Sequence, residues 1–425
     1  MSKVEQAIRT VVSHIDAYYA FCLEGCFHCH VCAYNCPFFN TFHTWEHVPV
    51  MIGDEVRKIY RYISTLSGRL LRTLASASKP SERDFEKWAK LAYNCLMCGG
   101  CSVACASILE EPPFTHLLRS AVHVAGLTPK PLADYASNEL ETGHPLRLSK
   151  EEWLSFIESS KSELGFDIPV DLKEAHYLLI PGWLEVKESP STLKAAFKAL
   201  NHLTSMLRVF YGVKATWTVS SEAYCLAFMP IMVGDFDNGR QLLSNVVEKI
   251  EKLKPKTVVV VGADYGFRVL KTMAKKLLGK PLPFQVKHIL TVLDENLSAL
   301  NLNKRANPDP VTYHDPCQIA RWSGVYREAR SVLKAAVENY REMYPSGILN
   351  WCCMGGGGLY EIPEKRDMIL KAFALKADQI YKTRAKIVAT ACTTCKLMLT
   401  EGCRHYGIPV EVVDIIELVA KAIKK

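Results

Sequence analysis

The spacing of its cysteines constrains this chain more than any other feature of the sequence. The chain has 425 residues and 16 cysteines, and thirteen of these cysteines fall into three blocks. The first block is Cys26, Cys29, Cys32 and Cys36, and the second repeats its spacing at Cys95, Cys98, Cys101 and Cys105. The third block is Cys317, the adjacent pair Cys352-Cys353, and then Cys392 and Cys395. Thiols grouped at such short, repeated intervals predict metal binding.

Disulfide-stapled secreted proteins are the other class in which cysteines are abundant. Here the chain is long, the cysteines stand three residues apart, and the first residues, MSKVEQAIRT, lack the charged-then-apolar pattern of a signal peptide. No stretch approaches the roughly 20 apolar residues of a membrane span, and runs such as 258–263 have the length of a strand. We therefore expect a cytoplasmic protein, which would sit peripherally at the cytoplasmic face of a membrane only by docking on a partner.

The first two blocks follow the run that holds [4Fe–4S] cubane clusters in bacterial ferredoxins. In proteins with two such runs, the fourth cysteine of each run binds the cluster of the other run. We therefore expect two cubane clusters with crossed ligand sets, and a zinc site would not need this symmetry of eight cysteines. The first set is Cys26, Cys29, Cys32 and Cys105, and the second is Cys95, Cys98, Cys101 and Cys36.

Two departures from the ferredoxin run concern the residues around the ligands. Ala106 stands where a proline is usual, and His28 and His30 stand where glycine is more usual, whereas the second block keeps Gly99 and Gly100. Neither departure removes a ligand. We expect the two histidines to affect solvation rather than to bind iron, because the four cysteines of each set already fill the site.

The formal net charge of +8 does not predict nucleic-acid binding. A [4Fe–4S] cluster with four thiolates carries a charge of roughly −2, so bound clusters offset much of the excess. We expect an ordinary solvated surface and no nucleic-acid partner.

The pattern of apolar residues changes near residue 172, and this change predicts an α+β protein with several domains. Before it, apolar residues recur at helical spacing, as at Ile8, Val11 and Ile15, and Pro112-Pro113 is expected to end the local structure after the second block. Beyond it, short apolar runs at 177–180, 256–263, 311–314, 386–391 and 410–413 alternate with amphipathic stretches, which predicts mostly parallel α/β units. We expect a helical ferredoxin-like domain at 1–145, a linker at 146–171, and α/β modules at 172–305 and 306–425.

The two α/β modules show an internal repeat. Residues 256–270 (KTVVVVGADYGFRVL) resemble 385–399 (AKIVATACTTCKLML). This alignment puts Ala263 on Cys392 and Gly266 on Cys395, and upstream it puts Tyr224-Cys225 on Cys352-Cys353. Trp183 falls near Cys317 in the same way. The second copy thus keeps five cysteines, whereas the first keeps only Cys225.

The third block, beginning Tyr313-His314-Asp315-Pro316-Cys317, resembles the cysteine-rich CCG module of heterodisulfide reductases. A ferredoxin domain followed by two CCG-type copies is the layout of the D subunit of those enzymes, and of the related K subunit of a sulfite-reductase-associated membrane complex. The resemblance spans nearly the whole chain. It implies a noncubane [4Fe–4S] cluster at which a disulfide is cleaved, with Cys317, Cys352, Cys353, Cys392 and Cys395 as ligands and catalytic residues.

The residues around the third block are compatible with an active centre. Five thiolates exceed the four that a simple cube requires. Gly355 and Gly356 follow the paired cysteines and let backbone N–H groups approach a cluster, although a glycine run can equally be a surface loop. Disulfide reduction consumes protons, so His314, with Asp315 beside it, is a candidate acid. The plainer alternative is a histidine at a strand end and a helix-capping aspartate.

The remaining cysteines and the first module carry weaker signals. Cys22 and Cys403 are expected in the core, with a resolving thiol as the alternative for Cys403. Because the first module has lost its ligands, one noncubane cluster is expected. This brings the chain closer to the K subunit, and that resemblance implies a disulfide or trisulfide of a partner protein as the substrate. Trp183 and Tyr224 are then candidates to line the substrate pocket.

Two functions of different classes follow. The first is a disulfide or thiol–sulfur oxidoreductase in sulfur or energy metabolism, in which two cubanes pass electrons to the third centre. Its expected partners are a cytochrome b-type membrane subunit or a flavoprotein. Its expected substrate is a disulfide, a small thiol or a sulfur-carrier protein. The alternative is an electron-transfer subunit without chemistry of its own, as in flavin-dependent glycolate or lactate dehydrogenases. The sequence does not encode the direction of the reaction or the electron donor.

Overall fold

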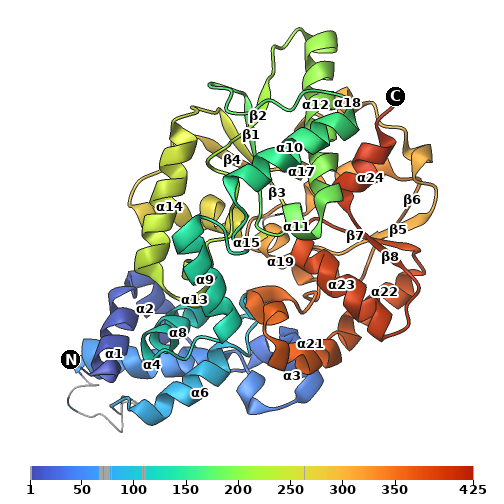
Figure 1. Ribbon diagram of the computed structural model, residues 1–425. Helices are drawn as coiled ribbons and strands as arrows, with labels where there is room; N and C mark the ends of the chain where they lie inside the picture. The colour runs from blue at the N-terminus through green and yellow to red at the C-terminus, as the bar shows by residue number, and fades with distance from the viewer. Residues whose placement is uncertain are drawn as a thin grey trace. The chain divides into compact units, whose positions relative to one another are not determined.

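The predicted division between a helical N-terminal region and later α/β units is visible in the computed structural model (Figure 1). The structure describes residues 2–66, 70, 77, 79–107, 109, 112–262 and 264–424. The chain packs as two compact units. Unit 1 is made of Met1–Ala136, Met229–Gly239 and Met354–Leu375, and unit 2 is made of Ser137–Phe228, Arg240–Cys353 and Lys376–Lys425.

Unit 1 is built from helices, and α8 packs against α1, α4 and α6. Its helices are α1 (Lys3–Ser13), α2 (Ala17–Glu24), α3 (Pro37–Phe42), α4 (Val50–Ser64), α6 (Glu82–Ala92), α7 (Gly100–Ala104), α8 (Pro112–Ala125), α13 (Met229–Val233) and α21 (Arg366–Ala372). Its 3-10 turns are η1 (Val31–Asn35), η2 (Trp45–His47), η6 (Gly356–Glu361) and η7 (Pro363–Lys365).

The helical pattern that begins at Ile8 is divided between α1 and α2, because Asp16 caps α2 by accepting the backbone N–H of Tyr19. One local expectation for unit 1 is wrong. The Pro112-Pro113 pair does not end an element but begins α8. Proline is tolerated in the first turn of a helix, where its missing N–H has no partner to lose.

Unit 2 contains two four-stranded sheets in the described part of the chain, with orders β2-β1-β3-β4 and β6-β5-β7-β8. All strand pairs in them are parallel, with Leu178 opposite Val258 in one sheet and Thr312 opposite Val388 in the other. The strands are β1 (Tyr177–Pro181), β2 (Trp217–Val219), β3 (Thr257–Val261), β4 (Gln285–His288), β5 (Pro310–Tyr313), β6 (Asn339–Arg341), β7 (Ile387–Thr390) and β8 (Glu411–Asp414).

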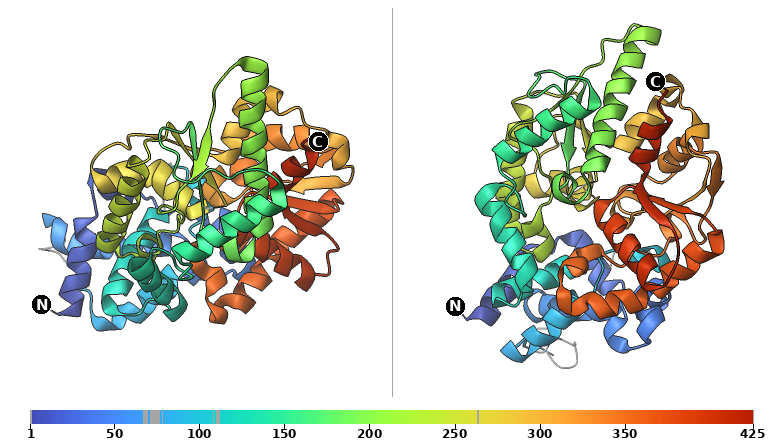
Figure 2. Two further views of the ribbon diagram at one scale, coloured as in Figure 1. Left: turned by 45° about the horizontal axis from the view of Figure 1, so that its top comes forward. Right: turned by 45° about the vertical axis from the view of Figure 1, so that its right-hand side comes forward.

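Helices cover the sheets, and α12 packs against α24 (Figure 2). The helices of unit 2 are α10 (Lys150–Leu164), α11 (Glu185–Glu188), α12 (Pro190–Tyr211), α15 (Asp264–Arg268), α16 (Ala274–Leu278), α17 (Ile289–Glu295), α18 (Leu297–Leu300), α19 (Cys317–Ala320), α20 (Arg327–Ala336), α23 (Thr393–His405) and α24 (Ile415–Ala422), with short turns η3 (Val269–Met273), η4 (Lys304–Ala306) and η5 (Gly347–Leu349). Three helices have residues in both units: α9 (Lys130–Thr142), α14 (Phe236–Glu251) and α22 (Ala374–Thr383).

The apolar runs form strands because β-branched residues suit a sheet that is covered on both faces. Val258, Val259 and Val260 of β3 are all fully buried. The five runs predicted as strands are β1, β3, β5, β7 and β8, so the parallel α/β prediction is confirmed. Among the described residues, no helix is both long enough and apolar enough to cross a membrane.

Candidate metal centres

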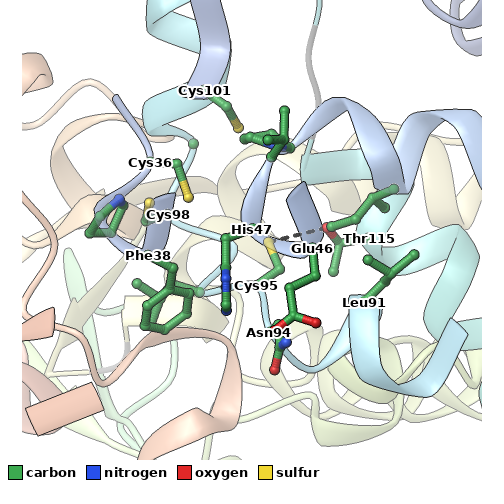
Figure 3. Close-up of a pocket in the computed structure, with 16 residues that line it drawn as sticks. Cys36, Phe38, Glu46, His47, Leu91, Asn94, Cys95, Cys98, Cys101 and Thr115 are labelled. Carbon is green, nitrogen blue, oxygen red and sulfur yellow. Dashed lines mark hydrogen bonds between the residues drawn. The ribbon is translucent and has the colours of Figure 1, made fainter. Parts of the chain in front are cut away.

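Four cysteines from the two ferredoxin-like runs line one pocket of unit 1. They are Cys36, Cys95, Cys98 and Cys101, and Phe38, His47, Leu91 and Thr115 are among the other lining residues (Figure 3). The pocket thus combines the last cysteine of the first run with three cysteines of the second. This is the grouping that crossed ligand sets require, and the role of the four cysteines as ligands stays a prediction.

The complementary four cysteines line a second pocket of unit 1. Its lining includes Cys26, Cys29, Cys32 and Cys105, together with the histidines 28 and 30 of the first loop. Cys29 is the exposed member of this set. The structure therefore separates the eight cysteines of the two runs into two groups of four, with one cysteine exchanged between the runs.

The two ligand loops have the same backbone conformation at matching positions. Two and four residues after the first cysteine, His28 and His30 have φ values of 52° and 59°, and Met97 and Gly99 have φ values of 50° and 75°. This left-handed conformation is the reason why glycine is usual there. His28 adopts this unfavourable backbone conformation, and its Nε2 lies 2.8 Å from Asp54 Oδ1. The His28 side chain thus makes a hydrogen bond within the protein rather than pointing at a cluster.

The electrostatics of the first pocket fit a metal centre. Burial raises the pKa of the Cys36 thiol to about 12, and burial also raises the pKa of Cys95. The Sγ of Cys95 accepts hydrogen bonds from the Met97 N–H and the Thr115 hydroxyl, both at 3.3 Å. Clustered thiolates in a low dielectric need a strong positive charge beside them. A bound iron–sulfur cluster supplies that charge, so the donor set fits the group.

The third cysteine block lies at the carboxyl edge of the β6-β5-β7-β8 sheet. Cys317 begins α19 just after β5, and Cys392 caps α23 just after β7, the strand next to β5. The Cys352-Cys353 pair follows η5, in the connection that leaves β6 on the other side of β5. Because parallel strands end at the same edge, three separate stretches of sequence deliver cysteines to one region. Cys317 is the most exposed of the five at 7%, so the set is shielded from water.

Several of these sulfur atoms are in direct contact. The Cys395 N–H donates to Cys392 Sγ at 3.2 Å. Burial raises the pKa of Cys395 well above its ordinary value, and hydrogen bonds with the thiols of Cys353 and Cys392 raise it further. A ring nitrogen of His314 and the Sγ atoms of Cys353 and Cys395 lie within 4.8 Å of one another. Thiols that hydrogen-bond to each other in a buried site become good ligands once a metal replaces their protons.

His314 and Asp315 have different surroundings. Burial, followed by the charge of Lys376, lowers the pKa of His314 well below its ordinary value, so the imidazole is neutral near pH 7. Asp315 accepts two hydrogen bonds of 2.8 Å from Arg330 and another from the Gly347 N–H. These partners make Asp315 a structural anchor of the surrounding loops.

The glycine run after Cys353 packs within unit 1. Gly357 and Gly358 have positive φ values. A Cβ on Gly357 would lie 2.7 Å from the carbonyl oxygen of Cys95, and a Cβ on Gly358 would lie 2.8 Å from a Leu132 methyl group. These glycines therefore permit a close approach to the Cys95 loop, and the expected contribution of Gly355 and Gly356 to a cluster site stays a prediction.

In the first α/β copy, other atoms of the protein occupy the space beside two glycines of the stretch that aligns with Cys392 and Cys395. A Cβ on Gly266, which aligns with Cys395, would lie 2.3 Å from the carbonyl oxygen of Leu226. A Cβ on Gly262 would lie 2.0 Å from the Glu185 carboxylate. Ala263, which aligns with Cys392, lies outside the described residues. Tyr224 and Cys225 line a polar pocket of unit 2, whereas Trp183 is not among its lining residues.

The two remaining cysteines are buried, as expected for core residues. Cys22 is 1% exposed and Cys403 is 2% exposed. Burial raises the pKa of Cys403 to about 12. A thiol with so high a pKa is a poor nucleophile near neutral pH, which argues against the resolving-thiol alternative.

Comparison with known proteins matches both cysteine-rich regions. Residues 22–109 match the 4Fe-4S dicluster domain, and residues 311–400 match the CCG cysteine-rich domain. The D subunit of the dihydromethanophenazine:CoB–CoM heterodisulfide reductase from Methanosarcina barkeri is 27% identical, over 94% of this chain and 94% of that protein. An Hdr-like menaquinol oxidoreductase iron–sulfur subunit of Archaeoglobus profundus is 25% identical, over 94% of this chain and 79% of that protein. The chain is thus similar, over nearly its whole length, to heterodisulfide reductase D and Hdr-like iron–sulfur subunits.

A third relative is a quinone oxidoreductase. The EtfAB:quinone oxidoreductase of Syntrophomonas wolfei is 24% identical, over 95% of this chain and 58% of that protein. The heterodisulfide reductase-like assignment is thus confirmed for the chain, together with its iron–sulfur character and its role as an oxidoreductase subunit.

Sequence reasoning missed two polar residues beside the third block. Lys376 of α22 is fully buried, and burial lowers its pKa to about 7. Its Nζ donates to Asn350 Oδ1 at 2.6 Å, and Asn350 is itself 4% exposed. A signal was available, because Phe373, Lys376 and Ile380 follow helical core spacing. A lysine at such a position marks a buried charge with a specific partner.

Proposed function

We propose that the chain is the disulfide-active subunit of a heterodisulfide reductase-type complex. Two [4Fe–4S] cubanes are held by the crossed cysteine sets of unit 1, and a noncubane cluster is held by Cys317, Cys352, Cys353, Cys392 and Cys395. Bound there, the cubanes would conduct electrons to the third centre, where a disulfide or a thiol-bound sulfur would be reduced or formed. The iron–sulfur oxidoreductase class follows from the family, and the chemistry at the third centre is the proposal.

The observation that carries the proposal is the gathering of buried thiols and a neutral imidazole at one sheet edge. Cys353, Cys395 and His314 lie within 4.8 Å of one another, and Cys392 hydrogen-bonds to Cys395. A single cube needs four thiolates, and this block offers five. A subunit that only conducts electrons has no need of the additional thiol or of the imidazole.

The reaction balances as one disulfide, two electrons and two protons giving two thiols. When bound, the noncubane cluster supplies the electrons and a site at which sulfur is held. The residues of the chain do the rest. The buried walls exclude water, and His314 places a nitrogen beside the sulfur atoms. Lys376, which is fully buried, donates to Asn350 beside the block.

We further propose that the two α/β modules are copies of one unit and that the first copy has lost its cluster. The two sheets share one strand order, and Leu226 and Glu185 occupy the space beside Gly266 and Gly262. One noncubane centre favours a substrate that reacts at a single cluster, such as the disulfide of a small thiol or of a sulfur-carrier protein. The complex would include a cytochrome b-type membrane subunit or a flavoprotein as electron donor, with this chain docked peripherally.

The test replaces Cys353 by alanine, with Cys225→Ala as the matched control. Both cysteines are buried, and they align in the two copies. In anaerobically purified protein, Cys353→Ala should abolish the reduction of disulfide substrates and lower the iron content by up to about four atoms per chain. Cys225→Ala should leave both quantities unchanged. Disulfide turnover that survives in Cys353→Ala would overturn the proposal.

The alternative of a passive subunit in a glycolate- or lactate-type dehydrogenase is not favoured. The three relatives carry the names of heterodisulfide reductase-like and quinone oxidoreductase proteins.

A further inference from the structure

Lys376 fixes the orientation of the Asn350 side chain. Lysine has three N–H donors and no acceptor. The Nζ of Lys376 lies 2.6 Å from one terminal atom of Asn350, 2.5 Å from Gln379 Oε1 and 3.4 Å from Met343 Sδ. The Asn350 atom that faces Lys376 must therefore be the acceptor Oδ1, and the amide nitrogen must point the other way. The ambiguity that usually attends an asparagine amide is absent here.

Asn350 in turn fixes the proton on His314. With Oδ1 facing Lys376, the two N–H groups of Nδ2 reach the backbone carbonyl of Asp315 and the Nδ1 of His314, each at 3.2 Å. An amide N–H only donates, so His314 Nδ1 accepts. A neutral imidazole that accepts at Nδ1 carries its proton on Nε2. A chain of three buried side chains thus sets one tautomer.

The protonated nitrogen of His314, Nε2, is the one that can donate to a sulfur atom. Among the described residues, the structure gives His314 Nε2 no hydrogen-bond partner, although the residue is fully buried. A ring nitrogen of His314 and the sulfur atoms of Cys353 and Cys395, which offer electron pairs, lie within 4.8 Å of one another, and Nδ1 is already taken up by Asn350. A buried N–H without a partner costs stability. Such a cost is tolerated where a ligand supplies the acceptor.

We propose that Lys376 and Asn350 are positioning residues that hold His314 as a neutral Nε2–H donor to sulfur at the third cysteine block. The inference rests on the proposed function, because that sulfur belongs to a cluster, to a ligand cysteine or to a bound substrate. An N–H directed at sulfur stabilises the negative charge that sulfur gains when an electron arrives. His314 thereby acts as a hydrogen-bond donor, and the protons consumed in the reaction come from elsewhere.

Asn350→Asp is the sharpest test, because it changes the shape of the side chain very little. An ionised aspartate only accepts, so His314 would move its proton to Nδ1 in order to donate to the new carboxylate. Nε2 would then lose its proton while every side chain stays near its place. Lys376→Met releases the amide of residue 350 and should weaken the same constraint. Lys382→Met, at an exposed position of α22, is the control.

The readout is electron–nuclear double resonance on the paramagnetic third centre of the holoprotein, in H₂O and in D₂O. His314→Leu and His314→Gln identify the proton, since glutamine keeps an N–H near the position of Nε2 and leucine does not. We expect an exchangeable proton coupling in the wild type, Lys382→Met and His314→Gln. The same coupling should be lost in His314→Leu and Asn350→Asp, and reduced in Lys376→Met.

A coupling that persists in Asn350→Asp would overturn the inference, as would a third centre that shows no exchangeable proton dependent on residue 314. Failure of the proposed function looks different. In that case the wild type holds only about eight iron atoms per chain and gives no third signal, and both proposals fall together.

Discussion

Asp414 carries a buried carboxyl group where β8 passes into α24. It is 2% exposed and accepts the backbone N–H of Ile416 at 2.9 Å. Burial, together with the nearby carboxylates of Glu417 and Glu185, raises its pKa to about 8. The folded state therefore keeps a proton on Asp414 at pH values where the unfolded chain has released it.

The sign of the pH effect follows from proton counting. Above the ordinary aspartate pKa near 4 and below about 8, the folded state binds more protons than the unfolded state, so stability falls as pH rises. Asp414→Asn keeps a helix-capping side chain and removes this loss. We expect the fall in Tm between about pH 5 and about pH 8 to shrink by a few degrees, at about 2–4 °C per kcal/mol. Anaerobic thermal melts across pH measure it.

The control for this prediction is Glu411→Gln, on the same strand and exposed to solvent. It should leave the slope of Tm against pH unchanged. If Asp414→Asn has the same slope as the wild type, Asp414 is ionised in the folded protein and the account of its burial is wrong.

At the scale of elements, the two cysteine loops of unit 1 depend on one close approach between backbones. Gly100 begins α7, and a Cβ on it would lie 2.6 Å from the carbonyl oxygen of Asn35 in η1. The Asn35 side chain returns a hydrogen bond to the Gly100 carbonyl at 2.9 Å. This contact joins the loop before Cys36 to the loop that carries Cys98 and Cys101.

Gly100→Ala should push these two loops apart. Overpacking of this kind costs about 1–3 kcal/mol, and here the strain falls on a cysteine set that draws on both loops. We expect faster release of iron from the anaerobic protein on exposure to a chelator, with a smaller reduced-cubane EPR signal. Gly126→Ala is the control, since Gly126 has a φ of 79° but no atom within 4 Å of the added Cβ. Equal iron release in the two variants would contradict the assigned contact.

The elements show what the sequence predicts and what it does not. Continuous apolar runs identified β1, β3, β5, β7 and β8, and the missed strands β2, β4 and β6 are all edge strands of three or four residues. A short edge strand is covered on fewer sides and carries no apolar run, as Asn339–Arg341 shows. The grouping of cysteines followed from their spacing, whereas the Lys376–Asn350 pair depends on packing between distant segments.

At the scale of the whole molecule, unit 1 collects segments that are far apart in the sequence. Arg119 of α8 is fully buried and donates to the carbonyl oxygens of Ala92, Met232 and Gly357 at 3.2, 3.1 and 2.8 Å. One guanidinium thus ties 229–239 and 354–375 to the ferredoxin-like helices. No local sequence pattern predicts these hydrogen bonds of Arg119, because periodicity indicates which face of a helix is buried and not which distant segment it contacts.

This arrangement also concerns the third block. The segment that begins at Met354, directly after Cys353, belongs to unit 1, and its Gly357 packs on the Cys95 loop. The chain therefore runs from Cys353 directly into the segment that packs on the Cys95 loop.

The most direct test of the account is EPR spectroscopy on anaerobically purified, oxidised protein, with and without a candidate thiol or disulfide, together with iron counting. The account predicts a substrate-dependent paramagnetic signal and roughly 12 iron atoms per chain, for three four-iron clusters. No paramagnetic signal in the oxidised protein, with cubane signals that appear only on reduction and about eight iron atoms, would contradict it and leave the chain as an electron-transfer subunit with an inert third block.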